Sequence, residues 1–377
     1  MGSLEIRLYH FPSAGRLGPD GRTLGTSRVI AGGYLLGFKQ LKRFLAPSIA
    51  ISLLLVALLA ACGNEEAEGS AGTLTIYSGR SESLVGPIIQ QFGEATGVEV
   101  LVKYAGTPQL AATLLEEGDR TPADVFFAQD AGGLGAVEHM LAPLPEETLR
   151  RVPTWARSFH SKWIGLSGRA RAVVYNTEKL TEDDLPDDIL DFADPKWKDR
   201  IGWPITNASF QASVTAMRLI LGEDGTREWL EGVLANKPWV YKNNSATVQA
   251  VAAGEVDVGF VNHYYLFRFL AEEGPSFQAR NYYPGYGGAG TIVNVAGAGI
   301  LSASNNVEAA QEFVGYLLSE EAQRSFADTT FEYPLVAGIP VHPDLVPLVE
   351  LDTPDIDLSG LSDLEGTLKL LLDAGVY

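Results

Sequence analysis

The chain has 377 residues, of which 46% are hydrophobic and 20% are charged. This length and composition are typical of a globular protein with enough apolar residues for the cores of two domains. The 47 acidic residues outnumber the 28 basic ones and give a net charge of −19, which makes nucleic acid an unfavourable partner.

Residues 1–61 form a predicted signal region, with a lipoprotein signal at about 39–61. Basic residues at 39, 42 and 43 precede the apolar stretch from Phe44 to Ala61, which ends in Leu59-Ala60-Ala61-Cys62. A basic segment, an apolar segment and a small-residue cleavage site are typical of an export signal, and these last residues resemble a lipobox. We therefore expect the mature chain to begin at an acylated Cys62 and to be lipid-anchored, on the extracytoplasmic face of the cell membrane or in the periplasm. A transmembrane or buried core helix is the alternative, although Pro47 interrupts the stretch.

The segment 62–72 is acidic and rich in small residues, which predicts a flexible tether. Removal of residues 1–61 leaves 21 basic and 45 acidic residues, a net charge of −24. Cys62 is the only cysteine, so its acylation leaves no thiol for a disulfide, a thiolate metal site or a cysteine nucleophile.

From Leu74 onward, strand and helix patterns alternate. The sequence predicts strands at 74–77, 98–103 and 123–128, with helices at 81–97 and 108–118 between them. Such repeated units favour a parallel sheet with helices on both faces, where ligands bind at the carboxyl ends of the strands. After a Pro- and acid-rich stretch at 143–153 and a strand at 170–175, a second α/β unit is expected from 191 to 283. An apolar strand at 291–300 and helices at 306–319 and 320–327 follow. The order predicts two lobes with a cleft between them.

Three predicted helices in the second unit begin next to asparagine. Asn207 precedes one helical pattern, Asn244 another, and Asn262 follows a strand at 256–261 and precedes a helix that ends at Gly274. Asparagine at an N-cap satisfies free backbone N–H groups, and the positive end of the helix dipole favours an anion. Tyr264 and Tyr265 lie at the third helix start, where a phenol ionises more easily. The pattern is that of a hard metal bound together with an anion, and the alternative is ordinary capping and packing.

Several motifs are similar to those of the ferric-ion-binding family of substrate-binding proteins of bacterial ABC importers. The resemblance covers roughly residues 74–339. The matching segments are Leu74-Thr-Ile-Tyr-Ser-Gly-Arg80, Thr121-Pro-Ala-Asp-Val-Phe-Phe127, Leu166-Ser-Gly-Arg-Ala-Arg171, Pro195-Lys-Trp-Lys-Asp-Arg-Ile-Gly202, Gly254-Glu-Val-Asp-Val-Gly259, Asn262-His-Tyr-Tyr265 and Glu332-Tyr-Pro-Leu335.

The resemblance implies an α/β chain with the type 2 periplasmic-binding-protein fold, in which two α/β lobes are joined by two crossing strands around a central cleft. The crossing strands are expected at about 169–176 and 291–300. Residues 73–168 and 301–345 would form lobe 1, and residues 169–300 and 346–377 would form lobe 2.

The resemblance also implies the ligand and the residues that bind it. Tyr264 and Tyr265 would bind Fe³⁺, and a synergistic anion such as carbonate or phosphate would complete the shell. The residues expected to line the anion are Asn207, Ala208, Ser209, Asn244 and Asn262, with Arg169 and Arg171 as further candidates. Ferric iron favours oxygen donors and promotes ionisation of a phenol. A guanidinium group can donate two parallel hydrogen bonds to carbonate or phosphate. For the arginines, an ion pair at the hinge is the alternative.

The chain departs from the family pattern at other ligand positions. Where many members have a histidine and a glutamate, this chain has Ser81 and Gln129. Other members use a third tyrosine, and that position is Asn207 here. Asp130 is a nearby carboxylate that could reach the metal, or else a surface or helix-capping residue. The exogenous anion or water must therefore supply the remaining donors.

The expected function is that of a monomeric receptor, without enzyme activity, that hands ferric iron to the ABC permease of an iron importer. One alternative keeps this fold with another small solute as cargo: an oxyanion, a thiamine-like cofactor or a polyamine. The other is a secreted phosphate-ester hydrolase that uses His263 with Ser209 or Ser245. Turnover of a phosphate ester would distinguish the enzyme from the receptor.

Overall fold

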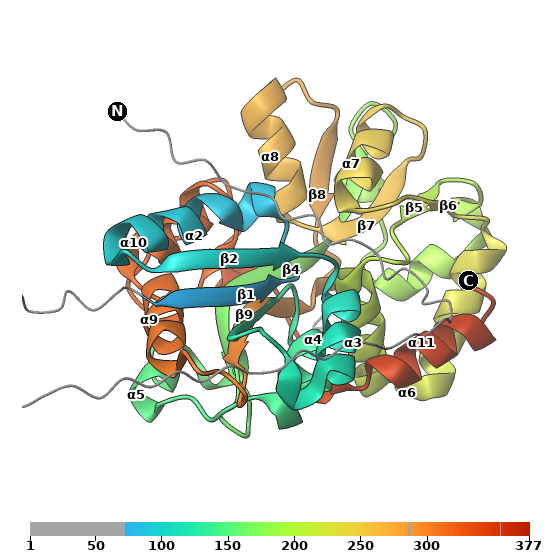
Figure 1. Ribbon diagram of the computed structural model, residues 1–377. Helices are drawn as coiled ribbons and strands as arrows, with labels where there is room; N and C mark the ends of the chain where they lie inside the picture. The colour runs from blue at the N-terminus through green and yellow to red at the C-terminus, as the bar shows by residue number, and fades with distance from the viewer. Residues whose placement is uncertain (1–71, 286–287, 355) are drawn as a thin grey trace, which may run out of the picture. The chain divides into compact units, whose positions relative to one another are not determined.

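The computed structural model describes residues 72–285, 288–354 and 356–377. The predicted lipoprotein signal, Cys62 and most of the tether lie outside these residues. Within them, no helix is both long enough and apolar enough to cross a membrane. Figure 1 shows the arrangement of the elements, whose labels are used below.

The first half of the chain builds a parallel strand group. Its elements are β1 (Thr73–Ser78), α2 (Glu82–Thr96), β2 (Glu99–Tyr104), α3 (Thr107–Glu117), β3 (Val125–Ala128), α4 (Ala131–Ala136) and α5 (Glu146–Leu149). β1 lies between β2 and β3 and is parallel to both, as the alternating pattern predicts. α2 begins after Ser81 and ends at Gly97, whose φ of 76° is in the left-handed region that favours glycine.

The second half of the chain supplies the elements that position the site. They are β4 (Ile164–Asn176), β5 (Ile201–Trp203), α6 (Ala208–Ala235), β6 (Trp239–Val240), α7 (Asn244–Ala252), β7 (Val258–Asn262), α8 (Tyr264–Glu273) and β8 (Ala279–Tyr282). They are followed by β9 (Val293–Ile300), α9 (Val307–Leu317), α10 (Glu320–Asp328), β10 (Tyr333–Pro334) and α11 (Leu364–Asp373). Short 3₁₀ turns connect many of these elements.

The long strand β4 takes part in both strand groups. Its first residues pair antiparallel with β9 and β10, and its last residues pair antiparallel with β7 and β8. β9 in turn pairs antiparallel with β3, so the strand order is β2-β1-β3-β9-β4-β7-β5-β6. The prediction of a parallel sheet is therefore right within each half and wrong for β4 and β9, which run against their neighbours.

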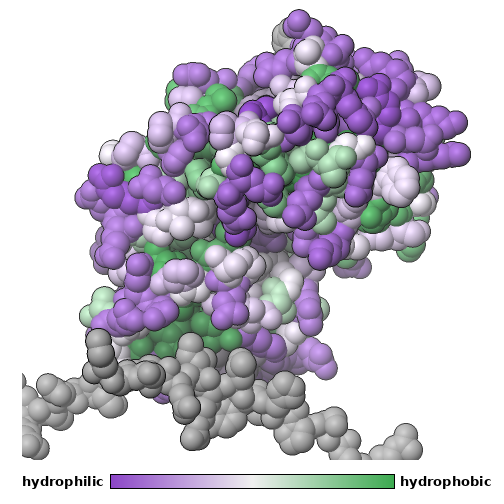
Figure 2. All heavy atoms as spheres, turned by 90° about the horizontal axis from the view of Figure 1, so that it is seen from above, coloured by the Kyte–Doolittle hydropathy of each residue, from purple (hydrophilic) through white to green (hydrophobic). Residues whose placement is uncertain are grey.

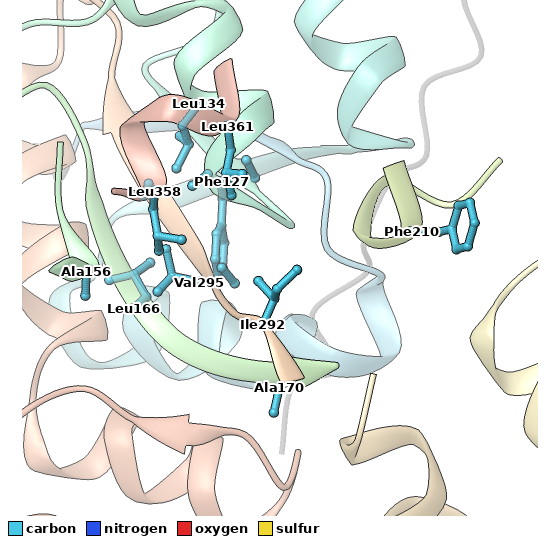
Figure 3. Packing of buried hydrophobic residues seen from close by; sticks show 14 of the residues in the cluster. Phe127, Leu134, Ala156, Leu166, Ala170, Phe210, Ile292, Val295, Leu358 and Leu361 are labelled. Atoms are coloured by element: carbon cyan, nitrogen blue, oxygen red, sulfur yellow. The ribbon is translucent and has the colours of Figure 1, made fainter. Parts of the chain in front are cut away.

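Buried apolar side chains fill the space between strands and helices. Phe92 of α2 contacts Phe313 of α9 edge to face, at 5.1 Å between ring centroids. Figure 3 shows Leu134 of α4 beside Leu358 and Leu361 of the C-terminal segment, whereas Phe210 of α6 lies apart from them. The face seen in Figure 2 is mostly hydrophilic, with apolar residues in small patches.

Candidate functional site

The two tyrosines of the predicted site lie at the start of α8. Their rings stack with centroids 4.2 Å apart. Tyr264 is fully buried, and its hydroxyl has no hydrogen-bond partner among the described residues apart from an interaction with the neighbouring Tyr265 phenol. Tyr265 is partly exposed. Burial, with the neighbouring Tyr264, raises the pKa of Tyr265 well above the usual value. Tyr265 therefore ionises only when a strong cation stabilises its phenolate.

The boundary of this helix differs from the sequence prediction. Asn262 is the last residue of β7, and His263 occupies the N-cap position without a side-chain capping bond. Asn262 is therefore not the N-cap. Its backbone N–H donates to Asn244 Oδ1 at 3.0 Å, and its side chain points into the site, as described below.

The N-cap of α7 also lies one residue earlier than the sequence predicts. Asn243, not Asn244, caps α7 and accepts from the backbone N–H of Ala246 at 2.9 Å. Asn244 is the first helical residue and is buried. Asn207 does cap α6, as predicted, and accepts from the backbone N–H of Ser209 at 3.0 Å. Ala208 is the buried first residue of that helix.

Ser209 is the point where the predicted anion residues meet. Its hydroxyl oxygen lies 3.0 Å from Gln129 Nε2, 3.1 Å from Asn262 Nδ2 and 3.2 Å from Arg169 Nη1. A hydroxyl oxygen has two acceptor lone pairs, so three N–H donors exceed what it can satisfy. The donors come from three separate elements and converge on one position, where an anion would satisfy all of them.

Two buried arginines from β4 line the same place. Arg171 Nη1 donates to Asn262 Oδ1 at 3.0 Å. Burial, together with the neighbouring Arg169, lowers the pKa of Arg171 to about 9. A small pocket is lined by Arg169, Arg171, Ser209, Ser213, Asn262, Ile292 and Asn294. Among the described residues neither arginine forms the ion pair that was the alternative to anion binding.

The other candidate metal ligands do not complete a metal shell. Ser81 is exposed at the start of α2, where its hydroxyl contacts Ser83. Gln129 is engaged with Ser209. Asp130 caps α4 by accepting from the backbone N–H of Gly133 at 2.9 Å, so the capping role is right, although the residue is buried rather than on the surface. Burial raises the pKa of Asp130. Among the described residues, no three His, Cys, Asp or Glu side chains cluster as a metal site.

His263 has a structural position. It is fully buried; Nδ1 accepts from the backbone N–H of Ala170 at 3.1 Å, and Nε2 lies 2.8 Å from the carbonyl oxygen of Phe331. Burial lowers the pKa of His263 to about 4. With both ring nitrogens held by backbone groups, His263 is not placed to activate Ser209 or Ser245, as the hydrolase alternative requires.

Sequence reasoning missed three residues next to the site. Arg80, at the carboxyl end of β1, forms a buried ion pair with Glu332, which also accepts from Ser167. The guanidinium carbon of Arg80 lies 5.9 Å from the centre of the Tyr264 ring. Burial disfavours the charge, but the Glu332 carboxylate outweighs this and raises the pKa of Arg80. Ser213 lies one helical turn after Ser209. The carboxyl end of a parallel strand and the i+4 position were the signals available for Arg80 and Ser213.

Known proteins share this architecture. A family model described as bacterial extracellular solute-binding protein matches residues 120–357. The major ferric iron-binding protein of Neisseria meningitidis serogroup B is 35% identical over 338 residues, which cover 87% of this chain and 99% of that protein.

Solved structures agree with the sequence relatives. The crystal structure of iron-bound HitA from Pseudomonas aeruginosa has a TM-score of 0.77 and 35% identity, covering 80% of this chain and 99% of that one. The structure of the Trichodesmium protein IdiA (FutA) in complex with iron and citrate has a TM-score of 0.70 and 30% identity, and the match covers 81% of this chain and 99% of that chain.

Proposed function

The chain belongs to the ferric-ion-binding family of bacterial extracellular solute-binding proteins, and we propose that it binds ferric iron through a tyrosine pair and a synergistic anion. It has the type 2 periplasmic-binding-protein fold, as predicted from the sequence. Solute-binding proteins of this family serve iron import with an ABC permease, and the relatives are transport proteins rather than enzymes. We place this chain outside the cytoplasm in the same role.

The observation that carries the metal proposal is the buried hydroxyl of Tyr264, which among the described residues interacts with the neighbouring Tyr265 phenol alone. A buried polar atom nearly always forms well-aligned hydrogen bonds, so this hydroxyl is a position kept for a ligand. The second phenol beside it supplies another hard oxygen donor. A ferric ion satisfies both, because it stabilises the phenolate charges that burial otherwise disfavours.

The convergence of donors at Ser209 supports the anion. Gln129, Arg169 and Asn262 all point N–H groups at one hydroxyl oxygen, at the start of α6. We assign the synergistic anion to this place, lined by the two β4 arginines, with Asn207, Ala208 and Asn244 supporting the local backbone. The anion then supplies oxygen donors that Ser81 and Gln129 do not.

We also propose that the chain forms two lobes, with β4 and β9 as the strands that cross between them. Lobe 1 comprises residues 73–168 and 301–345, and lobe 2 comprises 169–300 and 346–377. Iron and anion bind between elements of both, since Gln129 follows β3 and Ser209 lies on α6. The receptor acts as a monomer and closes on its ligand by selecting a conformation with these contacts.

The test is replacement of the tyrosines. Protein loaded with ferric iron is expected to show a phenolate-to-iron charge-transfer band, and Tyr264→Phe or Tyr265→Phe is expected to weaken iron binding by about a hundredfold or more, about 2.7 kcal/mol. Phenylalanine keeps the stacked ring, so the unfolding midpoint of the apoprotein should change little. Tyr316→Phe, on the remote helix α9, is the matched control. A colourless iron complex, or unchanged affinity in both variants, would show that the tyrosines are packing residues only.

The lipid anchor is a separate proposal. Leu59-Ala60-Ala61-Cys62 has the form of a lipobox, so Cys62 is the expected acylation site. Cys62→Ala should abolish incorporation of labelled fatty acid and block processing before residue 62, while Cys62→Ser tests the need for the thiol. Labelling of the Cys62→Ala protein would contradict the anchor and leave the iron site unaffected.

A further inference from the structure

The C-terminal segment Leu358–Tyr377 contacts two helices that begin on opposite sides of the proposed site. It consists of the 3₁₀ turn Leu358–Ser362, helix α11 and the last residues of the chain, and it is called the strap below. One of the two helices, α4, begins just after Gln129, and the other, α6, carries Ser209 in its first turn. Gln129 Nε2 and Ser209 Oγ are 3.0 Å apart, so the two helix starts meet at the site.

The turn of the strap fits closely against α4 in proposed lobe 1. Leu358 and Leu361 are each 1% exposed and lie beside Leu134 of α4 (Figure 3). A Cβ added at Gly135 would lie 2.6 Å from Ser362 Cβ, well inside the 3.5–4.0 Å at which carbon atoms attract. The turn therefore reaches this position only because α4 has no side chain there.

The strap continues onto α6 in proposed lobe 2, and Figure 1 shows α11 beside that helix. Arg218 of α6 donates to Asp363 Oδ2 at 2.8 Å and to the carbonyl oxygen of Asp363 at 3.1 Å. It also donates to Thr367 Oγ1 at 3.0 Å, and this hydroxyl lies 2.7 Å from that of Thr215, in a pair that is at most 2% exposed. The hydroxyl of the last residue, Tyr377, accepts from another α6 side chain at 2.8 Å. Directional polar contacts thus bind the strap to α6 along its length.

The contacts with the two lobes lie at adjacent residues of the strap. Ser362 touches α4, and Asp363, which follows it, is bound to α6. The strap also meets α4 at Gly132, three residues after Gln129 and so within one helical turn of the site. A motion that separates Gln129 from Ser209 therefore also has to separate α4 from α6 at the strap.

The two faces of the strap differ in what holds them. Among the described residues, lobe 1 holds the turn through apolar packing and one exposed hydrogen bond, from the Phe159 N–H to Ser359 Oγ at 3.2 Å. Separation from α6 would instead leave the buried Thr215 and Thr367 hydroxyls without each other, and an unpaired buried polar group is costly. The strap should therefore move with α6 and leave α4 when the cleft opens.

We propose that the strap is a latch between the lobes, which docks on α4 as the cleft closes and so raises iron affinity without touching the ligand. This inference rests on the proposed iron-binding function and adds a positioning element to it. The docked strap holds α4 and α6 at the spacing at which Gln129 reaches Ser209. Apparent affinity is reduced by the fraction of the protein that is not in the binding arrangement, so a latch that populates this arrangement before iron arrives strengthens binding.

Gly135→Ala tests the latch with one methyl group. Alanine favours a helix more than glycine does, and the three atoms nearest to the added methyl all belong to Ser362 of the strap. Gly232→Ala in α6 is the matched control, because its methyl would lie 2.6 Å from Ala193 Cβ, inside proposed lobe 2. Both variants should lower the midpoint of urea unfolding, but only Gly135→Ala acts between the lobes.

The separation of the lobes is measured on iron-free protein by double electron–electron resonance. Spin labels are placed at Leu115→Cys in α3 and Trp239→Cys in β6, which are exposed positions in lobe 1 and lobe 2, and the singly substituted proteins reveal any label on Cys62. Gly135→Ala is expected to lengthen this distance and to weaken iron binding about tenfold in competition with a chelator. Gly232→Ala should match the wild type in both. The charge-transfer band of the loaded protein should not move in either variant, because the tyrosines are unchanged.

Two further variants keep the test decisive. Gly135→Ala/Ser362→Gly lacks the nearest clashing atom and should recover part of the affinity and of the shorter distance. If Gly135→Ala does not fold, Thr367→Val removes the hydroxyl pair that fixes the strap to α6, with little change of shape, and should act in the same direction.

The outcomes separate the latch from the proposed function. A Gly135→Ala protein with the wild-type distance and affinity, or one weakened no more than Gly232→Ala, would show that the strap is packing alone, and the iron receptor would stand. Wild-type protein that binds no iron refutes the proposed function, whereas the distances in iron-free protein still decide whether the strap holds the lobes together.

Discussion

The buried imidazole of His263 ties the start of α8 to two backbone segments, and its charge state bears on stability. Nδ1 accepts an N–H from Ala170, so the proton of the neutral ring is on Nε2, facing the carbonyl of Phe331. The pKa in the folded chain, about 4, is below the unfolded value near 6.5. The unfolded chain therefore binds more protons between these values, and stability falls as the pH falls from 6.5 to 4, by about 3 kcal/mol in total.

Urea unfolding of the apoprotein at pH 7 and at pH 4.5 measures this effect. His263→Gln should be less stable at pH 7 but should lose less stability on acidification, because the titrating group is gone. His139→Asn, at an exposed position, is the control and should follow the wild type. If His263→Gln has the wild-type pH slope, folding does not lower the pKa of His263.

At the residue level the sequence predicted some of the residues that the structure brings together, and their role as a binding site stays a prediction. Tyr264, Ser209, Asn262 and the β4 arginines can be identified from their motifs, and the structure brings them close together. Their partners could not be predicted, because the Ser209 contacts join Gln129 and Arg169 across 80 and 40 residues of chain. Arg80 is held beside Tyr264 by its ion pair with Glu332, which is 252 residues away, and no local sequence pattern predicts such a contact.

At the scale of elements, α4 and the C-terminal turn at Leu358–Ser362 pack so closely that glycine is required between them. A Cβ added at Gly132 would lie 2.7 Å from the carbonyl oxygen of Leu361. Figure 3 shows Leu361 beside Leu134 of α4. Gly132→Ala should destabilise the chain by about 1–3 kcal/mol, because a backbone carbonyl has to move. The midpoint of urea unfolding measures the loss.

Gly315→Ala is the control for this prediction. It adds a methyl group in α9 with no atom within 4 Å, so it should be neutral or stabilising by up to about 1 kcal/mol through helix propensity. A Gly132→Ala protein as stable as the wild type would mean that the C-terminal turn is not firmly packed on α4.

Element boundaries show where local patterns fail. An asparagine before a helical run predicts the N-cap, and Asn207 fulfils this. In the run Asn243-Asn244, either residue satisfies the pattern, and the structure uses the first because Asn244 Oδ1 accepts from Asn262. Asn262 itself remains in β7 because its pairing with Arg171 of β4 extends the strand by one residue. Tertiary contacts decided both positions.

At the scale of the whole described body, β4 determines how the strand groups are linked. Helix and strand alternation correctly predicted the α/β class and the order of elements. It did not predict antiparallel β4 and β9, because an apolar strand has the same pattern in either direction. The thirteen-residue length of β4, against the expected 170–175, is what allows one strand to pair in both groups.

This linkage makes a prediction about unfolding. Because β4 pairs with β9 on one part and with β7 and β8 on the other, loss of either strand group removes partners from the same strand. We therefore expect the apoprotein to unfold in one thermal transition. If iron and the proposed anion bind only the folded chain, they should stabilise it by about 4 kcal/mol at a thousandfold excess of ligand over Kd and so move the whole transition to higher temperature.

Differential scanning calorimetry with and without iron and citrate measures this shift, and Tyr265→Phe serves as the matched protein in which the shift should shrink. The calorimetric and van't Hoff enthalpies should agree if the body is one cooperative unit. Two resolved transitions, of which ligand moves only one, would mean that the strand groups unfold independently. The ligand would then contact mainly one strand group. In that case closure between the lobes would contribute little to affinity, because a ligand that contacts both strand groups stabilises both against unfolding.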